Sequence, residues 1–234
     1  SPASRTASWS SHWPIKPDVV LEGGNWAAGA VPPPMRHGWL SLLSMHRNYP
    51  VKSFTFTYDT SAATALAAKD VTELWSEYPT LWPETVRGLY VSSARWTPQM
   101  RTHLPNSPQK GDYTPLFQRY GYGVPDVNRA RRSASNALTL IVEDTITPYR
   151  LSEKTGGDVH NEIKLFTLPW PVEALRALGN AEVTLRVTLS SFVSPNPSEA
   201  SRGVRYRYAS HNLRFNLNRA GESENQFMAR INKA

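Results

Sequence analysis

The feature that most constrains this chain is an abrupt change of residue pattern between Tyr58 and Ser61. Residues 53–58 read Ser-Phe-Thr-Phe-Thr-Tyr, and this enrichment in β-branched and aromatic side chains predicts a strand. Beyond Ser61 the apolar residues recur at helical spacing. They are Ala62, Ala65, Leu66, Val71, Leu74, Trp75 and Tyr78. The pattern predicts a strand-to-helix turn, with Ser61 on the first turn of a mostly buried helix that ends near Tyr78.

A serine in this position has two interpretations. The first turn of a helix offers unpaired N–H groups and a dipole that stabilise negative charge, which is the geometry that an acyl-transfer nucleophile uses. Alternatively, Ser61 caps the helix together with Asp59 and Thr60, since all three residue types are favoured N-caps. The small side chains that follow favour the nucleophile, because they allow very close packing that a cap does not need. They are Ala62, Ala63, Ala65, Ala67 and Ala68.

Three segments together resemble subtilisin-like (S8) peptidases. Residues 60–65 read T-S-A-A-T-A, which resembles the serine box G-T-S-x-A-x-P. Upstream, S-W-S-S at 8–11 and I-K-P-D-V-V at 15–20 resemble the family's S-F-S-S and K-P-D-V-x-A-P-G stretch. Downstream, Y-G-Y-G-V-P-D at 120–126 resembles the Y-G-x-G-x-V-x-A segment that closes the catalytic domain.

The chain also departs from the family pattern at three places. Asp59 stands where the serine box has Gly, Ala65 stands where it has Pro, and L-E-G-G at 21–24 replaces A-P-G. Asp tolerates left-handed backbone better than most residues, so the turn before Ser61 can persist with Asp59. The departures affect the expected shape of the substrate cleft.

The resemblance implies a serine endopeptidase whose nucleophile is Ser61. In subtilisins the triad runs Asp, then His, then Ser along the chain. The Asp and His boxes and the oxyanion-hole Asn lie upstream of the segment that residues 8–20 match. The chain therefore resembles the C-terminal portion of a longer peptidase, and we expect it to lack peptidase activity alone. His12, His37 and His46 precede Ser61 outside any H-G-T-x-V-A context.

A narrower resemblance is to cytoplasmic bacterial S8 peptidases found beside AAA-type ATPases in phage-defence pairs. It rests on residues 120–126 together with a β-rich region that contains Pro169-Trp170-Pro171. The partners implied are a protein or peptide substrate, the upstream half of the same peptidase, and an AAA ATPase. Whether the start at Ser1 reflects self-processing stays open. Asn25 is interpreted as a turn residue and not as the oxyanion Asn.

Composition excludes several classes of protein. Hydrophobic residues make up 40% and charged residues 19%, as in globular proteins. No apolar run approaches the roughly 18 residues of a membrane span, and residues 1–5 show no signal-peptide pattern. Cysteine is absent, which suits a reducing cytoplasm. The six histidines lack ligand spacing and no nucleotide motif occurs, so we expect no metal and no cofactor.

The basic excess of the chain suggests an alternative function. The net charge is +7, and residues 201–220 contain five Arg and no acid. Such a stretch could bind nucleic acid, with Tyr206 or Tyr208 stacking on bases, so a non-catalytic binding module is the alternative to the peptidase. However, Arg205 and Arg207 alternate with the two tyrosines, which favours a strand with a solvated arginine face. Nucleic-acid binding is thus the less favoured interpretation.

The predicted fold class is α/β. Residues 1–135 are expected to form the C-terminal portion of a parallel-sheet, subtilisin-like domain, with a second helix after Pro83 whose packed face holds Val86, Leu89, Tyr90, Ser93 and Ala94. Four prolines predict a surface loop over 97–116. Residues 136–234 are expected to form an antiparallel β-sandwich that lacks catalytic residues, with one short helix through Leu175 and a terminal helix over 222–232. Strands are predicted at 17–21, 39–45, 54–58, 137–142, 162–168, 181–193 and 206–217.

Overall fold

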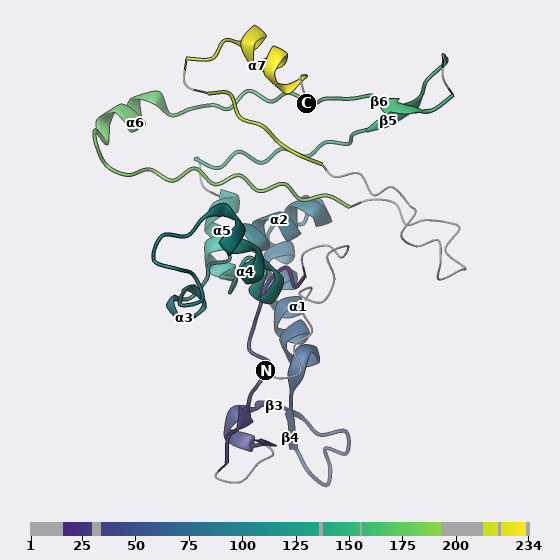
Figure 1. Ribbon diagram of the computed structural model, residues 1–234. Helices are drawn as coiled ribbons and strands as arrows, with labels where there is room; N and C mark the ends of the chain where they lie inside the picture. The colour runs from purple at the N-terminus through teal and green to yellow at the C-terminus, as the bar shows by residue number, and fades with distance from the viewer. Residues whose placement is uncertain are drawn as a thin grey trace. The chain divides into compact units, whose positions relative to one another are not determined.

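The computed structural model describes residues 16–29, 34–135, 138–154, 156–192, 213–219 and 221–232. Two compact units divide the chain. Unit 1 comprises Ser1–Glu143 and Pro169–Thr188, and unit 2 comprises Asp144–Leu168 and Leu189–Ala234. Unit 1 contains the resemblance segments and most of the helices (Figure 1). A domain boundary near residue 135 stays a prediction.

A β-hairpin leads directly into the longest helix of unit 1 (Figure 1). Strand β3 (Leu42–Met45) pairs antiparallel with β4 (Phe54–Thr57), and α1 (Asp59–Glu77) follows. The expected strand at 54–58 and the helix ending near Tyr78 are therefore confirmed. Only Ala62 and Leu74 of α1 are buried, so the expectation of a mostly buried helix is wrong. Among the described elements, only α2 and α5 make extensive contact with α1, and its other faces stay exposed.

The core of unit 1 lies where three helices meet. Helix α2 (Pro83–Ser93) starts with Pro at its first position, and α5 (Val127–Ser135) packs against it and α1. Leu74, Val86, Leu89 and Ala130 form the buried cluster, with Ile141 among the residues packed on it. All five residues predicted for the packed face of α2 are buried. The hydroxyl of Tyr90 donates to Asp70 Oδ2 at 2.8 Å and joins α2 to α1.

The segment predicted as a surface loop at 97–116 contains helices instead. These are α3 (Pro98–Arg101), the 3₁₀ helix η3 (Lys110–Asp112) and α4 (Tyr113–Tyr120). Proline was misleading here, because it is tolerated in the first turn of a helix and not only in loops. Pro98 starts α3, and Pro115 is the third residue of α4. Leu116 is buried, so this segment adds to the interior of unit 1.

The remaining strands of the described chain are short. In unit 1, β1 (Trp26–Ala27) pairs with β2 (Met35–Arg36), and the 3₁₀ helix η2 (Gly38–Leu40) occupies the start of the strand expected at 39–45. In unit 2, β5 (Tyr149–Leu151) pairs with β6 (Asp158–His160). All three sheets are antiparallel pairs, which together with the helices fit an α/β class. The parallel sheet and the β-sandwich are not confirmed and stay predictions.

Several predicted strands are not strands in the described structure. Residues 17–21, 138–142, 162–168, 181–192 and 213–217 carry no strand assignment. An apolar residue within a predicted strand is not thereby buried: Val183 and Phe215, which lie in the strands predicted at 181–193 and 206–217, are 54% and 52% exposed. Residues 201–212, with Arg205, Arg207 and both tyrosines, lie outside the described residues, so their interpretation is untested.

The two helices predicted in the C-terminal part are confirmed. In unit 1, α6 (Val172–Ala177) is the expected short helix. In unit 2, α7 (Glu224–Ile231) begins with a capping box at Ser223. Arg230 makes a two-pronged ion pair with Glu222, and its hydrogen bonds lower the pKa of that carboxyl to about 2. None of the helices that the structure describes is long and apolar enough to cross a bilayer.

Candidate active site

Ser61 lies where the sequence pattern predicts it, at a strand-to-helix junction. Strand β4 ends at Thr57, Tyr58 is the N-cap, and α1 starts at Asp59. Ser61 is therefore the third residue of α1, and it is exposed. Because the N-cap is Tyr58 and Ser61 lies inside the helix, Ser61 is not the N-cap residue. A 19-residue helix thus presents an exposed hydroxyl on its first turn, where the backbone N–H groups have no acceptor within the helix. This removes the capping interpretation for Ser61.

The turn before Ser61 is held by the segment that contains Gly23. The backbone N–H of Asp59 donates to Gly23 O at 2.6 Å. A Cβ on Gly23 would lie 2.6 Å from the carbonyl oxygen of Asp59, so only glycine allows this approach. Two residues further along, Asn25 N–H donates to Leu40 O at 2.7 Å and so joins the same segment to η2. The L-E-G-G departure from the family pattern therefore lies directly against the nucleophile turn.

A second set of backbone bonds joins residues 18–20 to residues 122–123. Tyr122 N–H donates to Asp18 O at 2.8 Å, and Val20 N–H donates to Gly123 O at 3.0 Å. Gly121 makes this possible, because its φ is 54° and a Cβ there would lie 2.1 Å from Pro17 O. The structure therefore brings together the described parts of all three segments that carry the sequence resemblance.

Comparison with known proteins agrees with this arrangement. A family model described as "Subtilase family" (Peptidase_S8) matches residues 1–123, more than half of the chain. The chain belongs to the subtilase family. Searches of curated proteins and of solved structures give no significant match. Subtilases are serine peptidases, so the family assignment supports a hydrolase of this class.

The histidines of this subtilase that the structure describes are engaged with residues other than Ser61. His37 Nδ1 accepts from Trp39 N–H, and His46 Nδ1 accepts from Asn48 N–H, so both stabilise local turns. His103 lies 3.0 Å from the hydroxyl of Tyr120, and His160 stacks on Tyr149 in unit 2. His12 lies outside the described residues. The amide oxygen of Asn25 also makes a local bond, because it accepts from Trp26 N–H, as expected of a turn residue.

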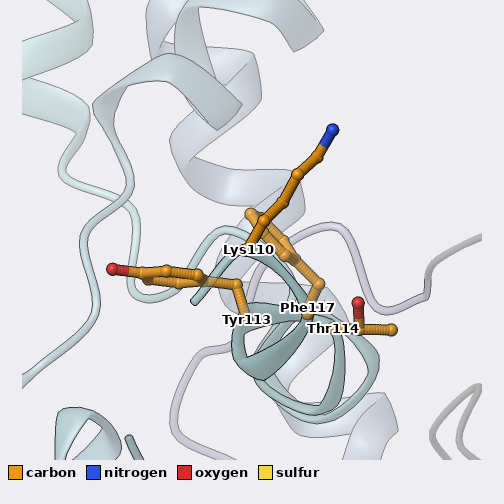
Figure 2. A pocket seen from close by; sticks show the side chains of 5 residues that line it. Lys110, Tyr113, Thr114 and Phe117 are labelled. Carbon is orange, nitrogen blue, oxygen red and sulfur yellow. The ribbon is translucent and has the colours of Figure 1, made fainter. Parts of the chain in front are cut away.

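An aromatic hollow beside α4 was not predicted from the sequence (Figure 2). It measures about 560 Å³ and is lined by Lys110, Gly111, Tyr113, Thr114 and Phe117. Trp96 lies against Tyr113 and Phe117, with ring centroids 5.8 and 4.9 Å away. The signal was available, because aromatic residues recur through this segment, but the prolines directed the interpretation to a loop. Its walls are mostly apolar, with one ammonium group at Lys110.

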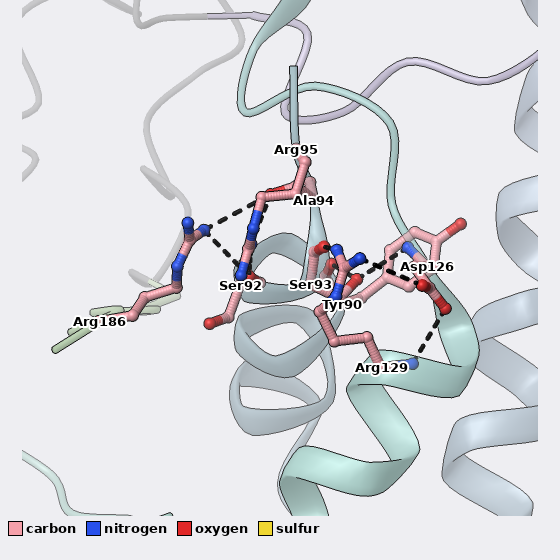
Figure 3. Close-up of polar contacts among 8 residues, drawn as sticks. All are labelled: Tyr90, Ser92, Ser93, Ala94, Arg95, Asp126, Arg129 and Arg186. Carbon is pink, nitrogen blue, oxygen red and sulfur yellow. Dashed lines mark hydrogen bonds and ion pairs between the residues drawn. The ribbon is translucent and has the colours of Figure 1, made fainter. Parts of the chain in front are cut away.

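Three arginines surround the C-terminal end of α2 (Figure 3). Arg95 and Arg186 donate to the carbonyls of Ser92 and Ala94, and Arg129 donates to the carbonyl of Ser93 at 2.5 Å. Cations are favourable there because the last carbonyls of a helix carry its negative dipole end. Burial and the charges of the other two arginines lower the pKa of Arg95. This cluster therefore caps α2, with one carboxylate, Asp126, paired to Arg129.

No metal centre is found in the described ranges. No group of three or more His, Cys, Asp or Glu side chains there could hold a metal ion. The chemical group that the candidate site presents is the exposed Ser61 hydroxyl on the first turn of α1.

Proposed function

We propose that this chain carries the nucleophile of a subtilase-type serine endopeptidase. Ser61 Oγ attacks the scissile carbonyl, the peptide C–N bond breaks, and the amine fragment leaves with a proton, so that an acyl-enzyme remains for water to hydrolyse. A His and an Asp from an upstream segment act as general base and orienting acid, and the Ser61 backbone N–H stabilises the oxyanion together with an upstream Asn. The observation that carries the proposal is the meeting of Gly23 with Asp59 at the turn that presents Ser61.

An exposed apolar face beside the site supports a larger catalytic domain. The β3–β4 register places Leu43 opposite Phe56 and Met45 opposite Phe54, so these four side chains share one face of the hairpin. They form what we call the apolar hairpin face, and each is more than half exposed. A solvated sheet face is normally polar, and an apolar patch marks a contact surface. We propose that polypeptide carrying the Asp and His boxes packs here.

The proposal extends to the C-terminal part and to the cell compartment. Residues 136–234 form an accessory β-domain that braces the peptidase or binds a protein partner, and the chain works in the cytoplasm. The resemblance to ATPase-paired peptidases makes an AAA ATPase that partner. Binding of nucleic acid by this domain would instead show an affinity that falls steeply with salt, flattened by substituting Arg205 and Arg207.

The test is labelling of the nucleophile by a fluorophosphonate probe. We expect a polypeptide that includes the upstream Asp and His boxes to be labelled, and Ser61→Ala to abolish labelling. Ser76→Ala is the matched control, because Ser76 is an exposed serine on the same helix. This chain alone should stay unlabelled, since a general base contributes about 10²–10⁴-fold. Labelling that persists in Ser61→Ala would place the nucleophile at another residue and overturn the proposal. Absence of labelling in the unsubstituted polypeptide would also overturn it and would favour the non-catalytic binding module.

A further inference from the structure

The side chain of Arg36 contacts Tyr58 and Asp59, the two residues that precede Thr60 and Ser61. Arg36 lies in β2 directly opposite Trp26 of β1. Its Nη2 is 2.6 Å from Asp59 Oδ2. Its guanidinium carbon lies 4.6 Å from the ring centroid of Tyr58 and 6.0 Å from that of Trp26, both within cation–π range. One side chain therefore contacts both residues immediately before Thr60 and Ser61.

The backbone of Asp59 needs such support. Its φ is 69°, the left-handed region, and it is the non-glycine residue in the described chain with a positive φ. This conformation is unfavourable for an ordinary L-residue, although Asp tolerates it better than most. The family pattern has Gly at this position, which adopts the conformation freely. Asp59 therefore keeps a glycine-type turn without the conformational freedom of glycine.

We propose that Arg36 is a positioning residue for Ser61. Its ion pair holds Asp59 in the left-handed conformation, and the Asp59 backbone sets the direction in which α1 starts. Two contacts hold Asp59. Its backbone N–H donates to Gly23 O, and its side-chain carboxylate accepts from Arg36. Asp59 and Ser61 share the first turn, so a relaxed Asp59 displaces the Ser61 hydroxyl. The role in catalysis rests on the proposed function, whereas the role in the turn does not.

The alternative interpretation is that Arg36 and Asp59 form an ordinary surface ion pair, and it predicts a different effect of losing Arg36. Such a pair contributes little to stability, and its loss leaves the local backbone unchanged. A positioning pair is coupled to the residue type at 59, because Gly at this position needs no support. The substitution Asp59→Gly therefore separates the two interpretations.

The first experiment uses nuclear magnetic resonance on four forms of this chain, which are wild type, Arg36→Leu, Asp59→Gly and the double variant. Wild type should show the strong intraresidue HN–Hα cross-peak of a positive φ at residue 59 and a protected amide there. Arg36→Leu should weaken the cross-peak and speed amide exchange about tenfold. The double variant should match Asp59→Gly. Arg131→Leu removes an ion pair with Glu77 at the other end of α1, and should leave residue 59 unchanged.

The second experiment measures kinetics on the complete peptidase. Arg36→Leu should lower kcat at least tenfold with little change in KM, because misplacement of a reacting group by about 1 Å can cost 10²-fold. Adding Asp59→Gly should restore kcat. If Arg36→Leu leaves residue 59 unchanged, or acts equally in the Asp59→Gly background, Arg36 is only a surface contact. Failure of Ser61→Ala to abolish labelling would refute the nucleophile assignment and leave the first experiment decisive.

Discussion

At the scale of single residues, Gly23 decides how closely the chain approaches the nucleophile turn. We expect Gly23→Ala to destabilise unit 1 by about 1–3 kcal/mol, because the new methyl group would overlap the Asp59 carbonyl and force the turn to move. The matched control is Gly111→Ala, where no atom lies within 4 Å of the added carbon. Urea unfolding monitored by tryptophan fluorescence checks both. Equal stability of the two variants would contradict the role assigned to Gly23.

The position of Ser61 was predictable, whereas its support was not. The change from β-type to helical pattern at residues 58–61 is local, so the sequence predicts the junction. The ion pair between Arg36 and Asp59 joins residues 23 apart and leaves no periodic trace. Only the departure of Asp59 from the serine-box Gly indicated that this turn needs an explanation.

At the scale of elements, Arg95 and Arg186 share the end of α2. Both donate to the carbonyls of Ser92 and Ala94, so each can replace the other, and their like charges oppose each other. We expect Arg95→Met and Arg186→Met each to cost less than about 1 kcal/mol, and the double variant about 2 kcal/mol or more. The control is Arg176→Met in α6, which is 73% exposed and pairs only along its own helix turn in the described contacts. Additive losses in chemical unfolding would show that the two arginines act independently.

The helices could be predicted where the apolar spacing is regular. The packed face of α2 follows directly from Val86, Leu89 and Tyr90. Helix α4 was missed because Pro115 and the prolines before it were interpreted as loop residues, although a helix accepts Pro in its first turn. The strands predicted from alternation at 181–192 and 213–217 lack pairing in the described residues, because a strand needs a partner that its own sequence does not specify.

At the scale of the whole molecule, the apolar hairpin face should govern association. We expect the isolated chain to self-associate with increasing concentration in sedimentation velocity. Met45→Thr with Phe54→Thr should reduce this, since Thr keeps the strand preference but removes apolar surface. Val172→Thr with Leu178→Thr is the control, because these residues in and beside α6 are similarly exposed. If the control reduces association equally, the hairpin face has no special role.

The bonds from Asp18 to Tyr122 and from Gly23 to Asp59 also bear on the order in which the molecule folds. Helices and the β3–β4 hairpin need only neighbouring residues, whereas these bonds close long loops whose entropy must be overcome first. The nucleophile turn should therefore be completed late. During synthesis on the ribosome, residues 18–20 find their partners only after residue 123 has emerged, and the helical core waits in turn for Ala130 of α5, so both are completed in the same late stage.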